Sequence, residues 1–175
     1  MLNPDGVVVG NYRCSLAGID LNRSYIAPSR KLHPTIFYTK QMIKRFTQDR
    51  EVVLSVDLHG HSKKMNVFMY GCEQRGDPRA KNLEKVFPRM LWKSSSIFSF
   101  RDCHFKTQKS KASTARVVMA KELGLANSFT MEATFAGANF GLLKGYHFST
   151  RELESMGHCF CDTILDYCDP DQVSE

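Results

Sequence analysis

Two histidines and an aspartate close one of the most apolar segments of the chain. The run 52–58 is β-branched and almost wholly apolar, which predicts a strand buried on both faces of a mostly parallel sheet. Asp57, His59 and His61 stand where that run ends, and ligands bind at the carboxyl ends of strands in open α/β sheets. This placement favours a metal-binding or catalytic site. The alternative is that the two histidines cap the strand and hydrogen-bond to backbone groups.

A single carboxylate interrupts a second apolar segment. Glu132 lies inside the predicted strand 127–135, where an unpaired charge is energetically costly. The side chain must therefore be paired, lie near a metal or serve as a general base. A buried ion pair with one of the arginines is the structural alternative. The segment 20–23 (Asp-Leu-Asn-Arg) is less informative, because on its own it predicts only a turn with an exposed arginine.

The surrounding pattern predicts the elements that position these side chains. Apolar runs predict strands, and apolar residues at helical spacing predict helices, one of which Pro88 would shorten or kink. The first thirty residues and the stretch 94–111 predict loops, with a turn at 3–6. Strands are expected at 52–58, 66–72 and 127–135, and helices at 35–48, 78–92, 114–121 and 149–167. Strands that alternate with helices predict a layered α/β fold.

Capping residues predict where two of these helices begin. Ser113 or Thr114 is expected to cap the helix that ends near residue 121. Ser149 followed by Glu152 has the spacing of a capping box, which predicts the start of the last helix.

Composition places the chain among ordinary globular proteins. It has 175 residues, of which 42% are hydrophobic and 24% charged, and this excludes a disordered tail, a collagen-like rod and a coiled coil. The 24 lysines and arginines exceed the 18 acidic residues, and the resulting net charge of +6 favours acidic partners. No phosphate-binding loop and no stripe of basic and aromatic residues accompanies that charge, so nucleic-acid binding is not expected.

Sequence signals for membranes and export are missing. The chain has no run of 18 apolar residues and no charged leader before an apolar run, so neither a membrane span nor a signal peptide is expected. The six cysteines are therefore expected to be free thiols in a reducing compartment. These observations predict a cytoplasmic protein without a membrane partner.

Seven short blocks follow one another along the chain. They are Asn-Pro-Asp-Gly-Val at 3–7, Gly-Asn-Tyr-Arg-Cys at 10–14, Gly-Ile-Asp-Leu-Asn-Arg at 18–23, Asp-Leu-His-Gly-His-Ser at 57–62, Phe-Met-Tyr-Gly-Cys at 68–72, Thr-Ala-Arg at 114–116 and Ser-Phe-Thr-Met-Glu at 128–132. Together and in this order they resemble the cytosolic carboxypeptidases, the deglutamylating branch of the zinc metallocarboxypeptidases. Each block alone is a weak signal, whereas seven in the family's order make a specific one. The resemblance covers about residues 1–150, and the ending 161–171 also looks like family sequence.

The resemblance implies a catalytic set. His59 matches the third protein ligand of a catalytic zinc ion, for which a neutral imidazole is a suitable donor. Glu132 matches the general base that takes a proton from water activated by the metal and passes it to the leaving amine. Arg13 matches the group that stabilises the oxyanion of the tetrahedral intermediate. Asp57 and His61 are assigned, by proximity alone, as groups beside the metal ligand or in the wall of the cleft.

The resemblance also implies how the substrate is held. Asn22 and Arg23 match the pair that binds a free C-terminal carboxylate, where a guanidinium fork fits two oxygens at once. Arg116 falls in the stretch that lines the pocket for the last side chain, with Lys109 or Lys111 as a candidate helper. A basic pocket favours glutamate as the terminal residue. The alternative for Arg116 is a solvent-exposed helix residue.

One part of the family's zinc site has no match in this sequence. The family takes two further ligands from a His-x-x-Glu motif that precedes the Asn-Pro-Asp-Gly block. None of the six histidines is followed three residues later by glutamate; those positions hold Ile36, Ser62, Lys64, Thr107, Thr150 and Cys161. A single imidazole holds zinc weakly, so the chain alone is expected to be a poor hydrolase.

These observations define the expected fold and domain. Residues 1–175 are expected to be the C-terminal portion of a zinc carboxypeptidase catalytic domain, truncated at its N-terminus. The expected architecture is a mixed, largely parallel sheet flanked by helices, with an exposed strand edge that favours association.

The expected function is that of a zinc-dependent metallocarboxypeptidase that removes C-terminal glutamates. Its expected partners are glutamate-rich protein tails like those of tubulin, which implies a cytoplasmic location with association with microtubules or cilia. The alternative is a non-catalytic module that uses Arg13, Asn22, Arg23 and Arg116 to bind acidic C-terminal tails without cutting them.

Overall fold

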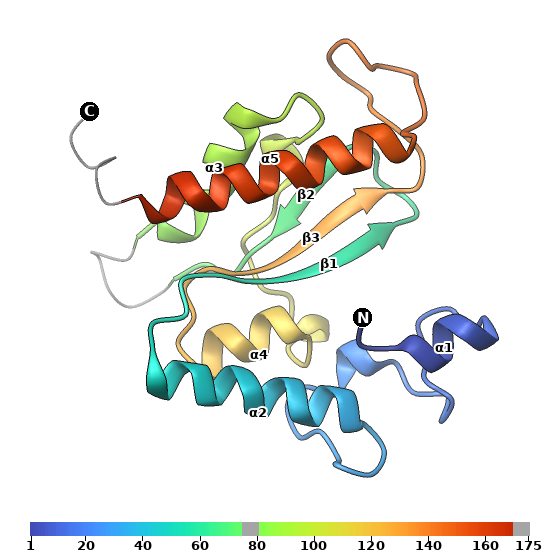
Figure 1. The fold of residues 1–175 in the computed structure, drawn as a ribbon, viewed down its shortest axis with the longest axis vertical. Coiled ribbons are helices and arrows are strands. Elements are labelled where there is room, and N and C mark those ends of the chain that lie inside the picture. The colour runs from blue at the N-terminus through green and yellow to red at the C-terminus, as the bar shows by residue number, and fades with distance from the viewer. Residues whose placement is uncertain (75–80, 170–175) are drawn as a thin grey trace. The chain divides into compact units, whose positions relative to one another are not determined.

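The computed structural model describes residues 1–74 and 81–169 and shows two compact units. Unit 1 contains residues 1–52 and 107–125, and unit 2 contains residues 53–106 and 126–175. Each unit has a hydrophobic core of its own. The elements of both units are labelled in Figure 1. None of the helices in the described residues combines the length and the apolar character needed to cross a membrane.

Unit 2 is built on a three-stranded mixed sheet. Its strands are β1 (Ser55–His61), β2 (Val67–Tyr70) and β3 (Ser128–Thr134), in the order β1-β3-β2. β1 runs parallel to β3, and β2 runs antiparallel to it. Together with the helices of the unit, this arrangement confirms the predicted α/β class of a mixed sheet flanked by helices.

Two helices of unit 2 pack together over the sheet (Figure 1): α3 (Leu83–Ser94) and α5 (Thr150–Cys168). Phe87 on α3 is fully buried and stacks on Phe129 of β3, with ring centroids 6.1 Å apart. Its ring also meets the edges of Phe160 and Tyr167 on α5. This aromatic cluster packs both helices against the face of the sheet that carries Phe129.

The local sequence predicted the start of α5 correctly, whereas the effect expected of Pro88 on α3 was not a helix end. The capping box predicted at Ser149 and Glu152 is present, and the hydrogen bonds from Ser149 lower the pKa of Glu152. Pro88 lies inside α3 without ending it. The start predicted for this helix at residue 78 lies outside the described residues, and the described helix begins at Leu83.

β1 corrects the prediction for the first strand. The strand was expected at 52–58 and buried on both faces, but it spans Ser55–His61 and is only partly buried, with Leu58 67% exposed. Within the described residues, β3 is the one strand that pairs with β1. Side chains alternate along a strand, so Asp57, His59 and His61 share one face of the sheet. The apolar run thus predicted the strand but neither its exposure nor its bounds.

Unit 1 is helical within the described residues. Its main helices are α2 (Pro34–Asp49) and α4 (Ala115–Glu122), both close to the predicted ranges. Lys40 on α2 pairs with Glu122 on α4 at 2.7 Å and also donates to the backbone oxygen of Tyr25. Seven buried residues form the core of the unit: Leu21, Tyr25, Ile36, Ala115, Val118, Met119 and Leu125.

The prediction of a simple turn at residues 3–6 is wrong, because a short helix, α1 (Pro4–Val9), begins there. The Asn3 side chain accepts a hydrogen bond from the Gly6 amide, and Pro4 occupies the first helical position. Asparagine and proline favour turns, but they also favour the cap and first position of a helix. Gly10 ends the helix with a positive φ of 75°, which glycine adopts without strain.

Candidate functional site

The predicted zinc ligand and the predicted general base are neighbours in the sheet of unit 2. His59 on β1 lies directly opposite Glu132 on β3 in the register of the two parallel strands. Adjacent strands lie about 4.8 Å apart, and paired residues project from the same face. The sheet therefore brings together two residues that are 73 positions apart in the sequence.

Glu132 is enclosed on its other side by β2. Phe68 is its partner in the antiparallel pairing and is fully buried. Glu132 is partly buried, and one of its carboxylate oxygens is shielded from solvent. A carboxylate that is partly removed from water beside an imidazole is suited to accept and return a proton.

Asp57 holds the ring of His59. The two residues lie two positions apart on the same face of β1, and His59 Nε2 is 2.8 Å from Asp57 Oδ2. The His59 side chain is 33% exposed and that of Asp57 24% exposed, so the pair is partly shielded from water. The interpretation of His59 as a strand cap bonded to the backbone does not describe this contact.

His61, in contrast, does cap the end of the strand through hydrogen bonds with backbone groups. Its Nδ1 atom accepts hydrogen bonds from the backbone amides of Lys63 and Lys64, at 3.2 and 2.9 Å. Its ring packs against the edge of Phe68. Burial lowers the pKa of His61, and the charges of Lys64 and Lys63 lower it further. These contacts bond His61 to the backbone, and its surroundings favour the neutral ring.

Unit 1 holds the four residues predicted to bind or stabilise anions, and one of them is oriented by an aspartate. Arg13 Nη1 lies 3.4 Å from Asp20 Oδ2, and Arg13 Nη2 donates to the Tyr12 hydroxyl at 3.5 Å. The Tyr12 hydroxyl has the largest effect and raises the pKa of Arg13; burial opposes it, and the Asp20 carboxylate raises the pKa further. Asp20 also accepts from the Asn22 amide at 3.0 Å. Sequence reasoning gave Asp20 no role, although Asp-x-Asn is the spacing of an Asx turn.

Asn22 connects this turn to the start of α4. Its Oδ1 atom accepts from the Ala115 amide at 3.0 Å, and its backbone oxygen accepts from Arg23 Nη1 at 2.9 Å. The predicted cap by Ser113 or Thr114 is wrong in detail. Thr114 occupies the cap position, but its hydroxyl donates to the Lys111 oxygen, and Asn22 supplies the cap from 93 residues away. The Asn22 carboxamide is thereby fixed with its oxygen toward the helix.

Arg116 is buried rather than solvent-exposed. It lies in the first turn of α4 and is 7% exposed, which contradicts the alternative of an exposed helix residue. Lys111 lies just before that helix, and the charge of Arg116 is one of several that shift its pKa. Burial lowers the pKa of Lys111, and Arg23, Arg13 and Arg116 lower it further, whereas Asp20 opposes them. These four cations therefore form one electrostatic cluster within unit 1.

The residues fit a bound metal only in part. Among residues 1–74 and 81–169, no group of three histidine, cysteine, aspartate or glutamate side chains could hold a metal ion. His59 fits the role of a single ligand, because metal-binding imidazoles usually donate their second ring nitrogen to a carboxylate. The described residues thus supply one candidate ligand, His59, rather than a group that could hold a metal ion.

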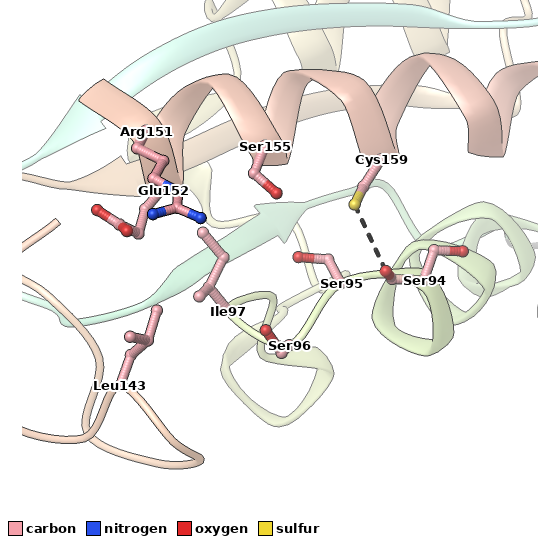
Figure 2. A pocket seen from close by; sticks show the side chains of 9 residues that line it. All are labelled: Ser94, Ser95, Ser96, Ile97, Leu143, Arg151, Glu152, Ser155 and Cys159. Atoms are coloured by element: carbon pink, nitrogen blue, oxygen red, sulfur yellow. Dashed lines mark hydrogen bonds between the residues drawn. The ribbon is translucent and has the colours of Figure 1, made fainter. Parts of the chain in front are cut away.

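A small pocket elsewhere in unit 2 is distinct from these residues. It has a volume of about 230 Å³ and lies between the start of α5 and the segment that follows α3 (Figure 2). Cys159 donates a weak hydrogen bond to the backbone oxygen of Ser94 at 3.4 Å on its wall. None of the residues predicted for chemistry lines this pocket.

Comparison with curated proteins identifies relatives over nearly the whole chain, although no protein-family profile matches it. The chain is 59% identical over 172 residues to cytosolic carboxypeptidase 2 of Danio rerio, which covers 98% of the chain and 24% of that relative. It is 57% identical over 177 residues to cytosolic carboxypeptidase 3 of Bos taurus, with 99% and 17% covered. The chain thus spans less than a quarter of the length of either relative.

Solved structures with the same fold are metallocarboxypeptidases. One is from Pseudomonas aeruginosa in complex with (2-guanidinoethylmercapto)succinic acid, with a TM-score of 0.79 and 28% identity over 93% of this chain and 43% of that one. Another, from Burkholderia cenocepacia, has a TM-score of 0.77 and 23% identity over 94% and 42%. Both neighbours are named metallocarboxypeptidases, and the similarity to the curated relatives extends over nearly all residues of the chain. The chain belongs to the cytosolic carboxypeptidase family.

Proposed function

We propose that this chain is part of a zinc-dependent carboxypeptidase that removes glutamate from the free C-terminus of acidic protein tails. The observation that carries the proposal is the cluster of cations in unit 1. Arg13, Arg23, Lys111 and Arg116 interact electrostatically, and one acidic residue, Asp20, lies among them. Four positive charges and one negative charge leave an excess of three.

A C-terminal glutamate supplies negative charges that suit this excess. It carries the α-carboxylate of the chain end and the carboxylate of its side chain. In the proposal, Arg23 and Asn22 bind the α-carboxylate, and Arg116 with Lys111 binds the side chain. Arginine forks fit carboxylates through two parallel hydrogen bonds, and partial burial strengthens each charge-assisted contact. Arg13 then stabilises the negative charge that develops on the carbonyl oxygen.

The paired residues of unit 2 supply the proposed chemistry. His59 contributes one ligand to the metal, and Glu132 accepts a proton from the attacking water and returns it to the leaving amine. Zinc, when bound, supplies a Lewis acid that polarises the carbonyl group and lowers the pKa of water. The proposal places the remaining ligands on a His-x-x-Glu motif outside residues 1–175.

Glutamate release from peptides tests the function directly. A peptide ending in several glutamates is incubated with the chain and Zn²⁺, and free glutamate is measured. Little or no release is expected from residues 1–175 alone, and release is expected from a longer chain that includes the two missing ligands. Amidation of the peptide C-terminus should abolish the release. Equal release from the amidated peptide would contradict the proposal.

A non-catalytic module that binds acidic tails is the second candidate. It is favoured by the lack of any three-residue metal-binding group among the described residues. Both candidates predict binding of a glutamate-terminated peptide, but only the enzyme predicts that the longer chain releases glutamate. Binding without release from that longer chain would select the module.

Tubulin-like tails are the proposed natural substrates. They are glutamate-rich and carry the negative charge that a basic chain with a net charge of +6 attracts. The relatives are named cytosolic, and association with microtubules or cilia is part of the proposal. Co-sedimentation with microtubules, before and after removal of the acidic tubulin tails, measures this association; equal sedimentation in both samples would contradict it.

A further inference from the structure

The exposed side of α3 carries a row of positive charges. Lys85, Arg89 and Lys93 follow one another at intervals of four residues, so they share one side of the helix and lie about 6 Å apart along its axis. Arg89 and Lys93 are exposed, and Lys85 is partly exposed. Glu84, the one acidic residue of α3, is buried with 1% of its surface exposed. The helix therefore places no negative charge beside these three residues, which we call the α3 cation row.

Two aromatic rings hold the central member of the row. The guanidinium carbon of Arg89 lies 4.8 Å from the ring centroid of Trp92 and 5.4 Å from that of Phe100. Phe100 belongs to the short helix Phe100–Asp102 and packs against the core of unit 2. Contacts of a guanidinium with aromatic rings restrict its motion. Arg89 therefore loses little freedom when its planar fork of N–H groups binds a pair of oxygens.

The α3 cation row is separate from the residues predicted for chemistry in unit 2. The helix packs against the face of the sheet that carries Phe129. Side chains alternate along a strand, so Glu132, three positions later on β3, projects from the opposite face together with His59. A ligand bound to the row would therefore contact neither Glu132 nor His59.

We propose that the α3 cation row, together with Trp92, is a docking surface for an extended acidic peptide segment. In an extended peptide every second side chain lies on the same side, about 6.6 Å apart, which is close to the spacing of the row. Carboxylates on that side can each meet one cation of the row. The Trp92 side chain is 42% exposed and offers apolar surface to the methylene groups of glutamate. The inference does not rest on the proposed function, because this docking needs neither a metal nor a free C-terminus.

The fluorescence of Trp92, the single tryptophan of the chain, tests the docking directly. The probe is an octapeptide of glutamate that is acetylated at its N-terminus and amidated at its C-terminus. A saturable change in emission is expected, and its half-saturation concentration should rise about tenfold when NaCl is raised from about 0.05 to about 0.3 M. The octapeptide of glutamine should cause no change. An emission that stays constant with the glutamate peptide would refute the proposal.

Substitutions of Arg89 test the row with a second readout, the fluorescence anisotropy of a dye-labelled glutamate peptide. Arg89→Ala should raise the dissociation constant about 10–100-fold, and Arg89→Lys, which keeps the charge without the fork, should raise it by a smaller factor. The matched control is Arg45→Ala on α2, which removes an exposed arginine from unit 1 and should leave the affinity unchanged. Circular dichroism checks that the variants are folded. Equal losses for Arg45→Ala and Arg89→Ala would overturn the proposal, because they would reduce the binding to general charge.

One further variant separates this surface from the proposed carboxypeptidase site. Arg23→Ala should leave the response of Trp92 to the amidated peptide unchanged, although Arg23 is proposed to bind a free terminal carboxylate. A response that is lost in Arg23→Ala would place the peptide on the cation cluster of unit 1 and refute the docking surface. Release of glutamate by the longer chain does not enter this test, so the two proposals can fail separately.

Other occupants of the row give different results. A nine-nucleotide oligothymidylate carries eight phosphates, the same number of charges as the octapeptide. If it changed the emission of Trp92 at equal or lower concentration than the peptide, the surface would be one for nucleic acid and the proposal would be wrong. Sedimentation velocity tests a second copy of the chain as the occupant. A wild-type dimer that Arg89→Glu converts to monomer would also overturn the assignment to a peptide.

Discussion

The two compact units of the chain hold different kinds of functional side chain. Unit 1 carries the permanent cations of the predicted site, held by a turn at Asp20 and by the start of α4. Unit 2 carries the imidazole and the carboxylate that can move protons, held opposite each other on β1 and β3. In the proposed function, recognition of charge would therefore depend on irregular backbone in unit 1. Proton transfer would depend on the register of two strands in unit 2.

This difference has a physical reason. Proton transfer needs atoms placed within a few tenths of an ångström, and side chains on paired strands have little freedom. Recognition of carboxylates by arginine and lysine tolerates more variation, because the side chains are long and the attraction acts over several ångströms. A loop that is fixed at a few points, as at Asn22, is sufficient for that task.

The largest expected effect concerns the core that holds the sheet of unit 2. Phe87→Ala removes a fully buried ring that contacts three other aromatic residues. The free energy of unfolding should fall by about 3–5 kcal/mol. Urea unfolding measures this loss, with the fluorescence of the single tryptophan, Trp92 on α3, reporting on unit 2.

A phenylalanine on the surface of unit 1 is the matched control for this change. Phe46 on α2 is 41% exposed, so Phe46→Ala should lower the free energy of unfolding by about 1 kcal/mol or less. Equal losses for the two variants would show that the aromatic cluster around Phe87 does not hold the sheet together.

The next largest effect is on peptide binding, and it distinguishes the residues proposed to bind the substrate from those proposed to carry out the chemistry. Arg23→Ala should weaken binding of a peptide ending in a free glutamate about 10–100-fold, because charge-assisted hydrogen bonds contribute about 1.5–3 kcal/mol each. His59→Ala should leave this affinity within about twofold while abolishing glutamate release by the longer chain. Isothermal titration calorimetry measures the affinities.

An arginine outside the cation cluster serves as the control for the loss of one positive charge anywhere on the chain. Arg45 lies on α2, pairs with Asp49 four residues later and is 71% exposed in its side chain. Arg45→Ala should leave peptide affinity unchanged. If His59→Ala weakened binding as much as Arg23→Ala, the division of roles between the two groups would be wrong.

The sequence predicted which helices and strands form better than it predicted their bounds, their exposure and their side-chain contacts. Short-range signals were reliable where one residue decides the outcome, as at the Ser149–Glu152 capping box. The bounds of β1 were wrong, because pairing of Ser55 with Ser128 decides where the strand begins, and no local pattern encodes that pairing. The motifs placed the candidate site residues by resemblance, whereas the contact of Asp57 with His59 required three-dimensional geometry.

The cap of α4 comes from Asn22, a residue 93 positions away, so the local sequence could not predict it. This contact leads to the third prediction. Asn22→Ala removes the acceptor for the Ala115 amide, which should lower the free energy of unfolding by about 1 kcal/mol. Asn22→Asp keeps an acceptor oxygen and should preserve stability, yet it should weaken peptide binding because its charge repels the terminal carboxylate. Chemical denaturation and peptide titration of both variants measure the two effects.

This pair of variants also tests the cap that local sequence predicted. If Thr114 capped the helix, Thr114→Ala would cost as much stability as Asn22→Ala. The Thr114 hydroxyl instead donates to the Lys111 oxygen, so a smaller loss is expected. An equal or larger loss for Thr114→Ala would restore the local interpretation.

The smallest expected effect on stability comes from the cation cluster itself. Burial and three neighbouring guanidinium groups oppose the charge of Lys111, so removing that charge should relieve repulsion in the folded state. Lys111→Met should raise the free energy of unfolding at neutral pH by less than about 1 kcal/mol and weaken binding of the glutamate peptide. Stability and affinity would then change in opposite directions, which is expected where charges are kept together for a ligand.

The pH dependence of Lys111→Met shows whether the repulsion is real. The folded-state pKa of Lys111 is lowered, so the unfolded chain binds more protons between that pKa and the ordinary lysine value of 10.5. The destabilisation is complete below the lowered pKa and disappears as pH rises toward 10.5. The stability gain of Lys111→Met should therefore shrink over that range, and peptide affinity of the wild type should fall there as Lys111 loses its charge. Lys111→Arg, which stays charged, should keep its affinity in alkaline solution; a parallel decline in both proteins would assign the pH effect to another group.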